Sequence, residues 1–110
     1  MIFVVAVVFG TNSNNESMSV EDYIIWGNEM GVEGNHLEAS KAFKNALLID
    51  PYSTPAYLGL GIAYGNVGRS KEAIEVFKEG IKLNSTHNSV AQMQMGIASI
   101  AYNKMGDKKT

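Results

Sequence analysis

The feature that most constrains the fold of this chain is an internal repeat with a period of 34 residues. Shifting residues 23–51 by 34 positions onto residues 57–85 aligns identical residues at several positions. The aligned pairs include Tyr23 and Tyr57, Gly27 and Gly61, Gly34 and Gly68, Ala39 and Ala73, Phe43 and Phe77, and Lys44 and Lys78. A third, partial copy at residues 100–107 matches residues 62–69 with an offset of 38. Periods in this range are typical of repeat architectures, in which each unit buries its apolar face against its neighbours.

Apolar residues within each unit recur every three or four positions, which predicts helices and no strands. The predicted helices cover residues 20–33, 36–49, 55–67, 70–83 and 90–105. Each of three residues stands three positions before an acidic residue or Gln and is expected to cap a helix start: Ser19, Asn35 and Ser89. Pro55 suits a first helical position. Three glycines follow apolar stripes and are expected to end helices: Gly34, Gly68 and Gly106.

With these residues at this spacing, the sequence resembles the tetratricopeptide repeat family over residues 20–107. The family pattern is W-x2-L-G-x2-Y followed by A, F, A and P. The first unit supplies Tyr23, Trp26, Gly27, Met30, Ala39, Phe43, Ala46 and Pro51. The second supplies Tyr57, Leu60, Gly61, Tyr64, Ala73 and Phe77, with Gly80 and Ser85 where Ala and Pro are usual. The third supplies only Met95, Ala98, Ser99, Tyr102 and Gly106.

The resemblance implies an all-α, right-handed superhelical solenoid of helix-turn-helix repeats, each pairing an A helix with a B helix. About two and a half units are expected, at residues 20–53, 54–87 and, in part, 88–107. Together they form a repeat domain over residues 19–107, preceded by an apolar segment and polar linker at residues 1–18. Small residues are expected where helices A and B approach each other, and aromatic residues are expected to fill the volume around those contacts. The small residues are Gly27, Gly61, Ser99, Ala39 and Ala73.

Composition argues against several classes of function. The 110 residues suffice for one continuous core but not for two. A formal net charge of −2 lacks the basic excess of a duplex-binding protein, so no nucleic-acid partner is expected. The chain has no Cys, and its two histidines, His36 and His87, have no ligand partner at helical spacing. The sequence therefore predicts a protein that is not an enzyme and holds no metal or cofactor.

The N-terminal segment differs from the rest of the chain. Residues 1–9 are uncharged and apolar, and residues 11–17 are polar. Nine helical residues rise about 14 Å, against about 30 Å for a bilayer core, so this segment cannot span a membrane alone. It also lacks the basic start of a signal peptide. Three interpretations stay open: the tail of a clipped export or anchor segment, an arm packed on the domain or on a neighbour, and a cloning artefact. The chain is cytoplasmic if complete, and exported or membrane-attached if this segment is a clipped signal or anchor.

In the family that this sequence resembles, the A helices line a concave surface that receives peptides. The residues projected onto that groove are Ile24, Asn28, Leu58, Ile62, Met93, Gly96, Ile100 and Asn103. Family members that hold the C-terminal carboxylate of heat-shock chaperones use two Lys, two Asn and an Arg in the groove. The five corresponding positions here are Ile24, Asn28, Gly59, Met93 and Ile97. The chaperone clamp is therefore expected to be absent, and an apolar peptide or amphipathic helix of a partner protein is the expected ligand, with Asn28 and Asn103 contacting its backbone.

Two further associations remain possible from the sequence. Helix 90–105 is apolar around much of its circumference, which indicates either scattered exposure beside helix 70–83 or docking onto another chain or a further B helix. The alternative function is a structural oligomerisation or capping module attached to a membrane through residues 1–9. Residues 2–9 are also a candidate ligand for the groove, in the same chain or exchanged with a neighbour.

Deleting residues 1–10 tests this last hypothesis. If residues 2–9 fill the groove, their removal exposes apolar surface, and the deletion lowers the melting temperature or changes the oligomeric state. Calorimetry and light scattering measure the two quantities, and unchanged values of both would exclude the hypothesis.

Overall fold

The computed structural model describes residues 18–84 and 88–109, and the side chains of residues 18–84 and 88–103. This part of the chain forms five helices and no strand, which confirms the predicted all-α solenoid. The helices are α2 (Val20–Val32), α3 (His36–Ile49), α4 (Thr54–Asn66), α5 (Ser70–Leu83) and α6 (Val90–Lys109). Every predicted boundary lies within one residue of the observed one except the end of the last helix.

Local signals account for several helix starts, with two corrections, at Asn35 and Pro55. Ser19 and Asp22 form the expected capping box, in which each side chain accepts the other residue's backbone N–H at 3.1 Å. Asn35 precedes α3, but its side chain makes no cap hydrogen bond and donates instead to the Glu33 carboxylate at 3.4 Å. Ser53 caps α4 by accepting the Ala56 N–H. The cap at Ser53 makes Thr54 the first helical residue, so Pro55 is second and not first.

Glycine ends two helices and not the third. Gly34 and Gly68 have φ values of 86° and 89°, in the left-handed region where a Cβ is unfavourable, and each follows a helix. The prediction that Gly106 ends the last helix is wrong, because α6 continues to Lys109. Glycine only weakens a helix interior, and the Asp and Lys residues that follow Gly106 do not break a helix.

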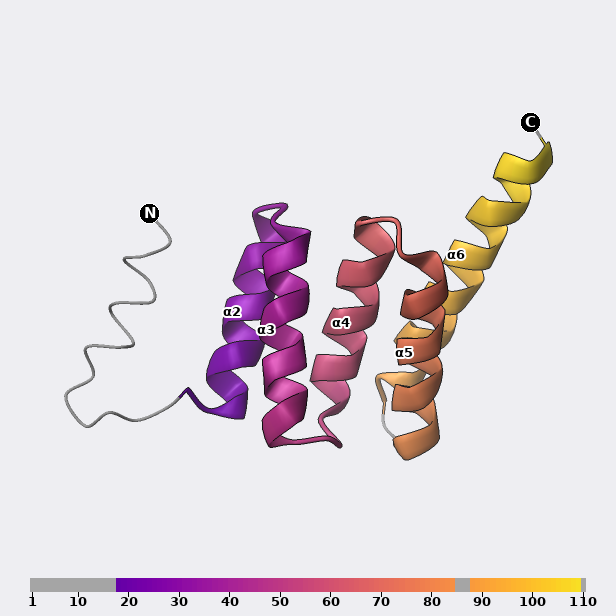
Figure 1. Ribbon diagram of the computed structural model, residues 1–110. Coiled ribbons are helices and arrows are strands. Elements are labelled where there is room, and N and C mark those ends of the chain that lie inside the picture. Colours follow the sequence, from indigo (N-terminus) through magenta and orange to yellow (C-terminus); the bar gives the residue numbers. More distant parts are fainter. Residues whose placement is uncertain (1–17, 85–87, 110) are drawn as a thin grey trace.

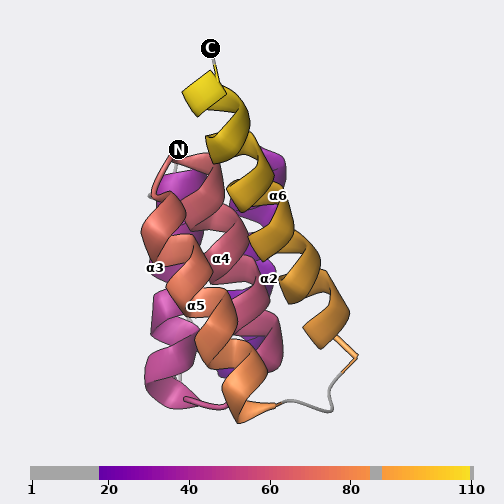
Figure 2. The same ribbon diagram turned by 90° about the vertical axis from the view of Figure 1, so that its right-hand side faces the viewer.

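The five helices stack side by side in chain order, with α2 and α6 at opposite ends (Figure 1). Helix α2 contacts α3 and α4, and α6 contacts α4 and α5. Seen along the stack, α3 and α5 lie on one side and α2 and α6 on the other, with α4 between (Figure 2). In the order of the repeat units, α2, α4 and α6 correspond to the A helices, and α3 and α5 correspond to the B helices. Because only near neighbours touch, stability comes from units and their interfaces rather than from one central core.

Each B helix contributes one buried phenylalanine that packs against glycines of two A helices. The ring of Phe43, 3% exposed, faces Gly27 on α2 and Gly59 on α4. The ring of Phe77, 1% exposed, faces Gly61 on α4. A Cβ on Gly27 would stand only 2.6 Å from Phe43, so the helices reach this separation because no side chain intervenes. The prediction that Phe43 and Phe77 lie in the core is confirmed.

The third unit packs in a different register from the predicted one. The motif places Met95, Ala98, Ser99 and Tyr102 at core positions, but all four are exposed, with Met95 at 70% and Tyr102 at 76%. Met93, fully buried, takes their place, and Gly96 replaces Ser99 as the small residue that the Phe77 ring approaches. The reason is steric: a Cβ at position 96 would stand 2.7 Å from the ring, so this position needs a glycine.

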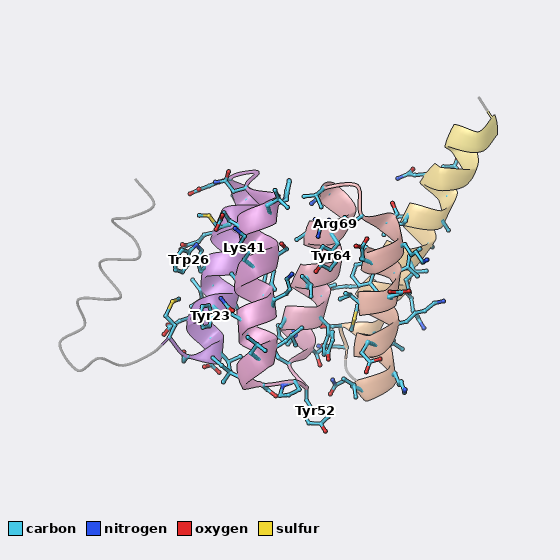
Figure 3. The ribbon with its side chains drawn as sticks, in the orientation of Figure 1. Tyr23, Trp26, Lys41, Tyr52, Tyr64 and Arg69 are labelled. Atoms are coloured by element: carbon cyan, nitrogen blue, oxygen red, sulfur yellow. The ribbon has the colours of Figure 1, made fainter. Side chains whose placement is uncertain are left out.

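Side-chain hydrogen bonds join the two full units at the turn ends. Tyr57 Oη donates to the Pro51 carbonyl at 2.9 Å, and Asn84 Nδ2 donates to the Tyr52 carbonyl at 3.1 Å. Desolvation by burial, aided by the Glu79 and Asp50 charges, raises the pKa of the Tyr57 hydroxyl above its usual value. Tyr57 therefore keeps its proton and its donor role through neutral pH. In Figure 3, Tyr52 lies at the bottom of the molecule, at the turn between α3 and α4.

Replacing Phe77 by Ala should strongly destabilise the array. The change removes a ring that fills the space between α4, α5 and α6, and the expected loss is about 3–5 kcal/mol of unfolding free energy. Urea denaturation followed by circular dichroism measures it. A loss below about 1 kcal/mol would contradict the assigned role of this ring in the core.

Two glycine-to-alanine changes separate close packing from helix propensity. Gly61→Ala places a methyl group into the Phe77 ring and should destabilise the protein by about 1–3 kcal/mol. The matched control is Gly31→Ala, since no atom lies within 4 Å of its added Cβ, and alanine there should be neutral or stabilising by up to about 1 kcal/mol. Equal effects of the two variants on the melting temperature would show that close packing of Gly61 against Phe77 does not contribute to stability.

Candidate peptide-binding groove

The curvature of the stack follows from which helices touch. Successive A helices are in contact, since α2 meets α4 and α4 meets α6. No contact joins the B helices α3 and α5 in the described part of the chain. The A helices are therefore closer together than the B helices, and the array curves toward the A side. This side is the concave face, where the sequence analysis projects the groove.

A first pocket of about 340 Å³ lies between α2 and α4. The Phe43 ring and Ala39 of α3 form its floor, and Ile62 of α4 and Val32 of α2 stand at its sides. Ile62 is 51% exposed and Val32 89%, so both present apolar surface to a ligand. The full lining is Gly27, Asn28, Gly31, Val32, His36, Ala39, Phe43, Gly59, Ile62, Ala63 and Asn66. We call this the α2–α4 pocket.

A second pocket of about 200 Å³ repeats this arrangement between α4 and α6. Phe77 of α5 takes the position that Phe43 has in the first pocket. Ile62 and Asn66 line both pockets, so α4 forms the wall that they share. The full lining of this α4–α6 pocket is Gly61, Ile62, Gly65, Asn66, Phe77, Gly96, Ser99, Ile100 and Asn103. The two pockets together form one groove across three A helices.

Five of the eight residues projected from the sequence line this groove: Asn28, Ile62, Gly96, Ile100 and Asn103. Ile24 packs against the core and lines a separate hollow near the start of α2. Leu58 is half-buried and lines neither pocket. Met93 is fully buried, with its sulfur 2.8 Å from where a Cβ on Gly80 would lie, so its side chain belongs to the α5–α6 interface and not to an open surface.

Asn66 is the functional candidate that the sequence projection missed. It follows Ile62 by four residues and therefore lies on the same face of α4, one turn further along. The spacing of four residues from Ile62 could have identified Asn66 from the sequence, because a ligand that lies along the groove contacts more than one turn of each A helix. With Asn28 and Asn103, it gives each of the three A helices an exposed carboxamide in the groove. A carboxamide can both donate to and accept from a peptide backbone.

Formal charges lie outside the groove. Neither pocket is lined by Lys, Arg, Asp or Glu. Lys44 and Arg69 instead flank the buried Tyr64 ring, with Lys44 Nζ 5.9 Å and the Arg69 guanidinium carbon 5.8 Å from its centroid. Figure 3 shows Arg69 beside Tyr64, close to the turn between α4 and α5. The Lys41–Glu38 ion pair, at 3.3 Å, lies along α3. Apart from His36, which lines the α2–α4 pocket, the groove therefore offers no side chain that could carry a positive charge opposite a ligand carboxylate.

Metal-binding and membrane-spanning features can be examined for the described residues only. Those residues contain no cluster of three His, Cys, Asp or Glu side chains suited to a metal ion, and His87 lies outside them. Their helices include none with the length and apolarity needed to cross a bilayer. Residues 1–9 lie outside the described residues. The structure therefore does not test the predictions that this segment attaches to a membrane or fills the groove.

These observations define the class of the molecule, a helical-repeat protein with a concave apolar groove. Residues 54–87, which contain α4 and α5, match the family model described as a tetratricopeptide repeat. The match confirms the resemblance predicted from the sequence over the second predicted unit. Comparison with curated proteins and with solved structures gave no match. The repeat supports a general role as a protein–protein interaction module.

Proposed function

We propose that the chain is a non-enzymatic scaffold that binds an uncharged, apolar peptide segment or one face of an amphipathic helix of a partner protein in the groove formed by α2, α4 and α6. The observation that carries this proposal is the composition of the groove lining. Above the buried Phe43 and Phe77 rings, Val32, Ile62 and Ile100 supply apolar contact, and the polar groups include three carboxamides. Such a lining favours apolar side chains and penalises ligands whose charges would lose water without gaining a partner.

The dimensions of the groove support a short ligand. The α2–α4 pocket, at about 340 Å³, lies near the lower end of the range of about 300–1,000 Å³ for small-ligand pockets. It accommodates a few side chains rather than a folded domain. The α4–α6 pocket adds a second, smaller site beyond the wall formed by Ile62 and Asn66. A ligand with two apolar anchors, one for each pocket, therefore fits the groove best.

The three carboxamides explain how an apolar ligand could be oriented. Asn28 and Asn66 line the first pocket, and Asn66 and Asn103 line the second. All three are exposed, so a ligand can reach them without rearrangement of the groove. Hydrogen bonds from these amides to the ligand backbone would satisfy polar groups that binding removes from water. Anchors would then supply affinity, and the asparagines would fix direction and register.

Selection of peptides from a random phage-displayed library against the full chain tests the proposal. We expect enrichment of peptides with two apolar anchors and no requirement for a free carboxylate. Ile62→Lys should weaken the selected peptides about tenfold or more, because it buries a charge in the wall shared by both pockets. Asn66→Ala should weaken them by about 0.5–1.5 kcal/mol, the value of one hydrogen bond.

The matched control is Leu48→Lys, because Leu48 is 81% exposed on α3 and lines neither pocket. It adds the same charge and should leave peptide affinity unchanged. Fluorescence anisotropy of a labelled peptide gives the dissociation constants of the parent chain and of the three variants. Enrichment of acidic peptides, or equal loss of affinity in the Ile62 and Leu48 variants, would contradict binding in this groove.

A further inference from the structure

The outward face of α6 carries a regular apolar stripe that no described helix covers. Ala91, Met95, Ala98 and Tyr102 follow one another at spacings of four, three and four residues. At about 100° per residue these four positions share one narrow face, directly opposite the face of Met93, Ile97 and Ile100 that packs on the array. All four are exposed, and α6 contacts only α4 and α5. In Figure 1, α6 closes the end of the stack opposite to α2.

The spacing of the stripe is that of helix pairs that interlock side chains, in which apolar positions alternate every three and four residues. Its residues alternate small and large in the order Ala, Met, Ala, Tyr. Well-packed helix interfaces place small residues opposite large ones. A stripe of this composition therefore needs a partner with the reverse order of sizes.

A second copy of α6, running antiparallel, has that reverse order. A two-fold axis passing between residues 96 and 97 brings Met95 of one copy opposite Ala98 of the other, and Ala91 opposite Tyr102. The same axis generates both reciprocal pairs, as a symmetric dimer interface requires. Each large side chain meets a small one at all four positions. A parallel pairing would instead oppose Met95 to Met95 and Tyr102 to Tyr102.

The absence of charge is compatible with the same partner. From Val90 to Asn103, α6 contains no Lys, Arg, Asp or Glu. A charge on this face would lose water against the apolar side chains of the other copy and oppose pairing. The residues that flank the stripe include Gln94 and Ser99, which can hydrogen-bond across an interface without a charge cost.

We propose that the exposed face of α6 is a homodimer interface, in which two copies of the chain pair antiparallel through Ala91, Met95, Ala98 and Tyr102. The pairing leaves the groove open, because the stripe residues line neither the α2–α4 pocket nor the α4–α6 pocket. One helix pair is smaller than the interface of about 1,600 Å² typical of stable complexes. The dimer therefore dissociates on dilution.

Sedimentation velocity of the full chain, from micromolar to near-millimolar concentration, measures the dimerisation. Met95→Glu should raise the dimer dissociation constant about tenfold or more, because a carboxylate would lose water against an apolar partner. Leu48→Glu is the matched control: it places the same charge at an exposed apolar residue of α3, away from α6, and should leave the constant unchanged. Both side chains are exposed, so the melting temperature of each variant should match that of the parent.

Disulfide trapping tests the register, since the chain contains no Cys. Chains carrying Met95→Cys and chains carrying Ala98→Cys, one of them bearing an affinity tag, are mixed and oxidised at equilibrium. The antiparallel pairing predicts that the mixed disulfide exceeds both like-with-like disulfides. A chain that stays monomeric at all concentrations overturns the proposal. A dimer that Met95→Glu leaves intact also overturns the proposal, and association through residues 1–9 would give this result. An excess of the disulfide that joins two Met95→Cys chains would overturn the antiparallel register.

Discussion

The contact between a phenylalanine ring and a pair of facing glycines is the interaction on which the rest of the structure depends. Phe43 lies against Gly27 and Gly59, and Phe77 lies against Gly61 and Gly96. Each ring comes from a B helix and touches two successive A helices, so a single residue sets both the spacing within a unit and the spacing between units. The same contact brings the A helices together and produces the concave face. The rings that hold the array together are also the floor of the groove.

The sequence predicted the first two units well because their information is local. Ser19 with Asp22, Gly34, Gly68 and the recurrence of apolar residues each act within one or two helical turns, and the observed helices begin and end within a residue of the expected positions. The position of α6 depends instead on a tertiary choice. The identities between residues 100–107 and 62–69 pointed to Ser99 as the closely packed residue, whereas the Phe77 ring lies against Gly96. The local sequence of α6 does not indicate which of its small residues will pack against the Phe77 ring of α5.

The groove was predicted in part for the same reason. Asn28, Ile62 and Asn103 could be projected because the resemblance assigns groove positions on each A helix, and all three line the groove. Met93 could not be placed correctly without the register of α6, and it is buried. Asn66 was missed because the projection assigns only selected positions of each helix. The contact between α2 and α4 places a further turn of α4, with Asn66, at the same pocket.

Contacts that join only neighbouring helices have a further consequence for ligand binding. Among the described helices, only α4 and α5 contact α6, so it can detach in a sub-global opening that leaves the remaining helices folded. Such an opening removes one wall of the α4–α6 pocket, while the walls of the α2–α4 pocket stay in place. The two halves of the groove thus have unequal lifetimes. A bound segment can release its anchor at the α6 end and keep the other, and complete dissociation then proceeds in two stages rather than one.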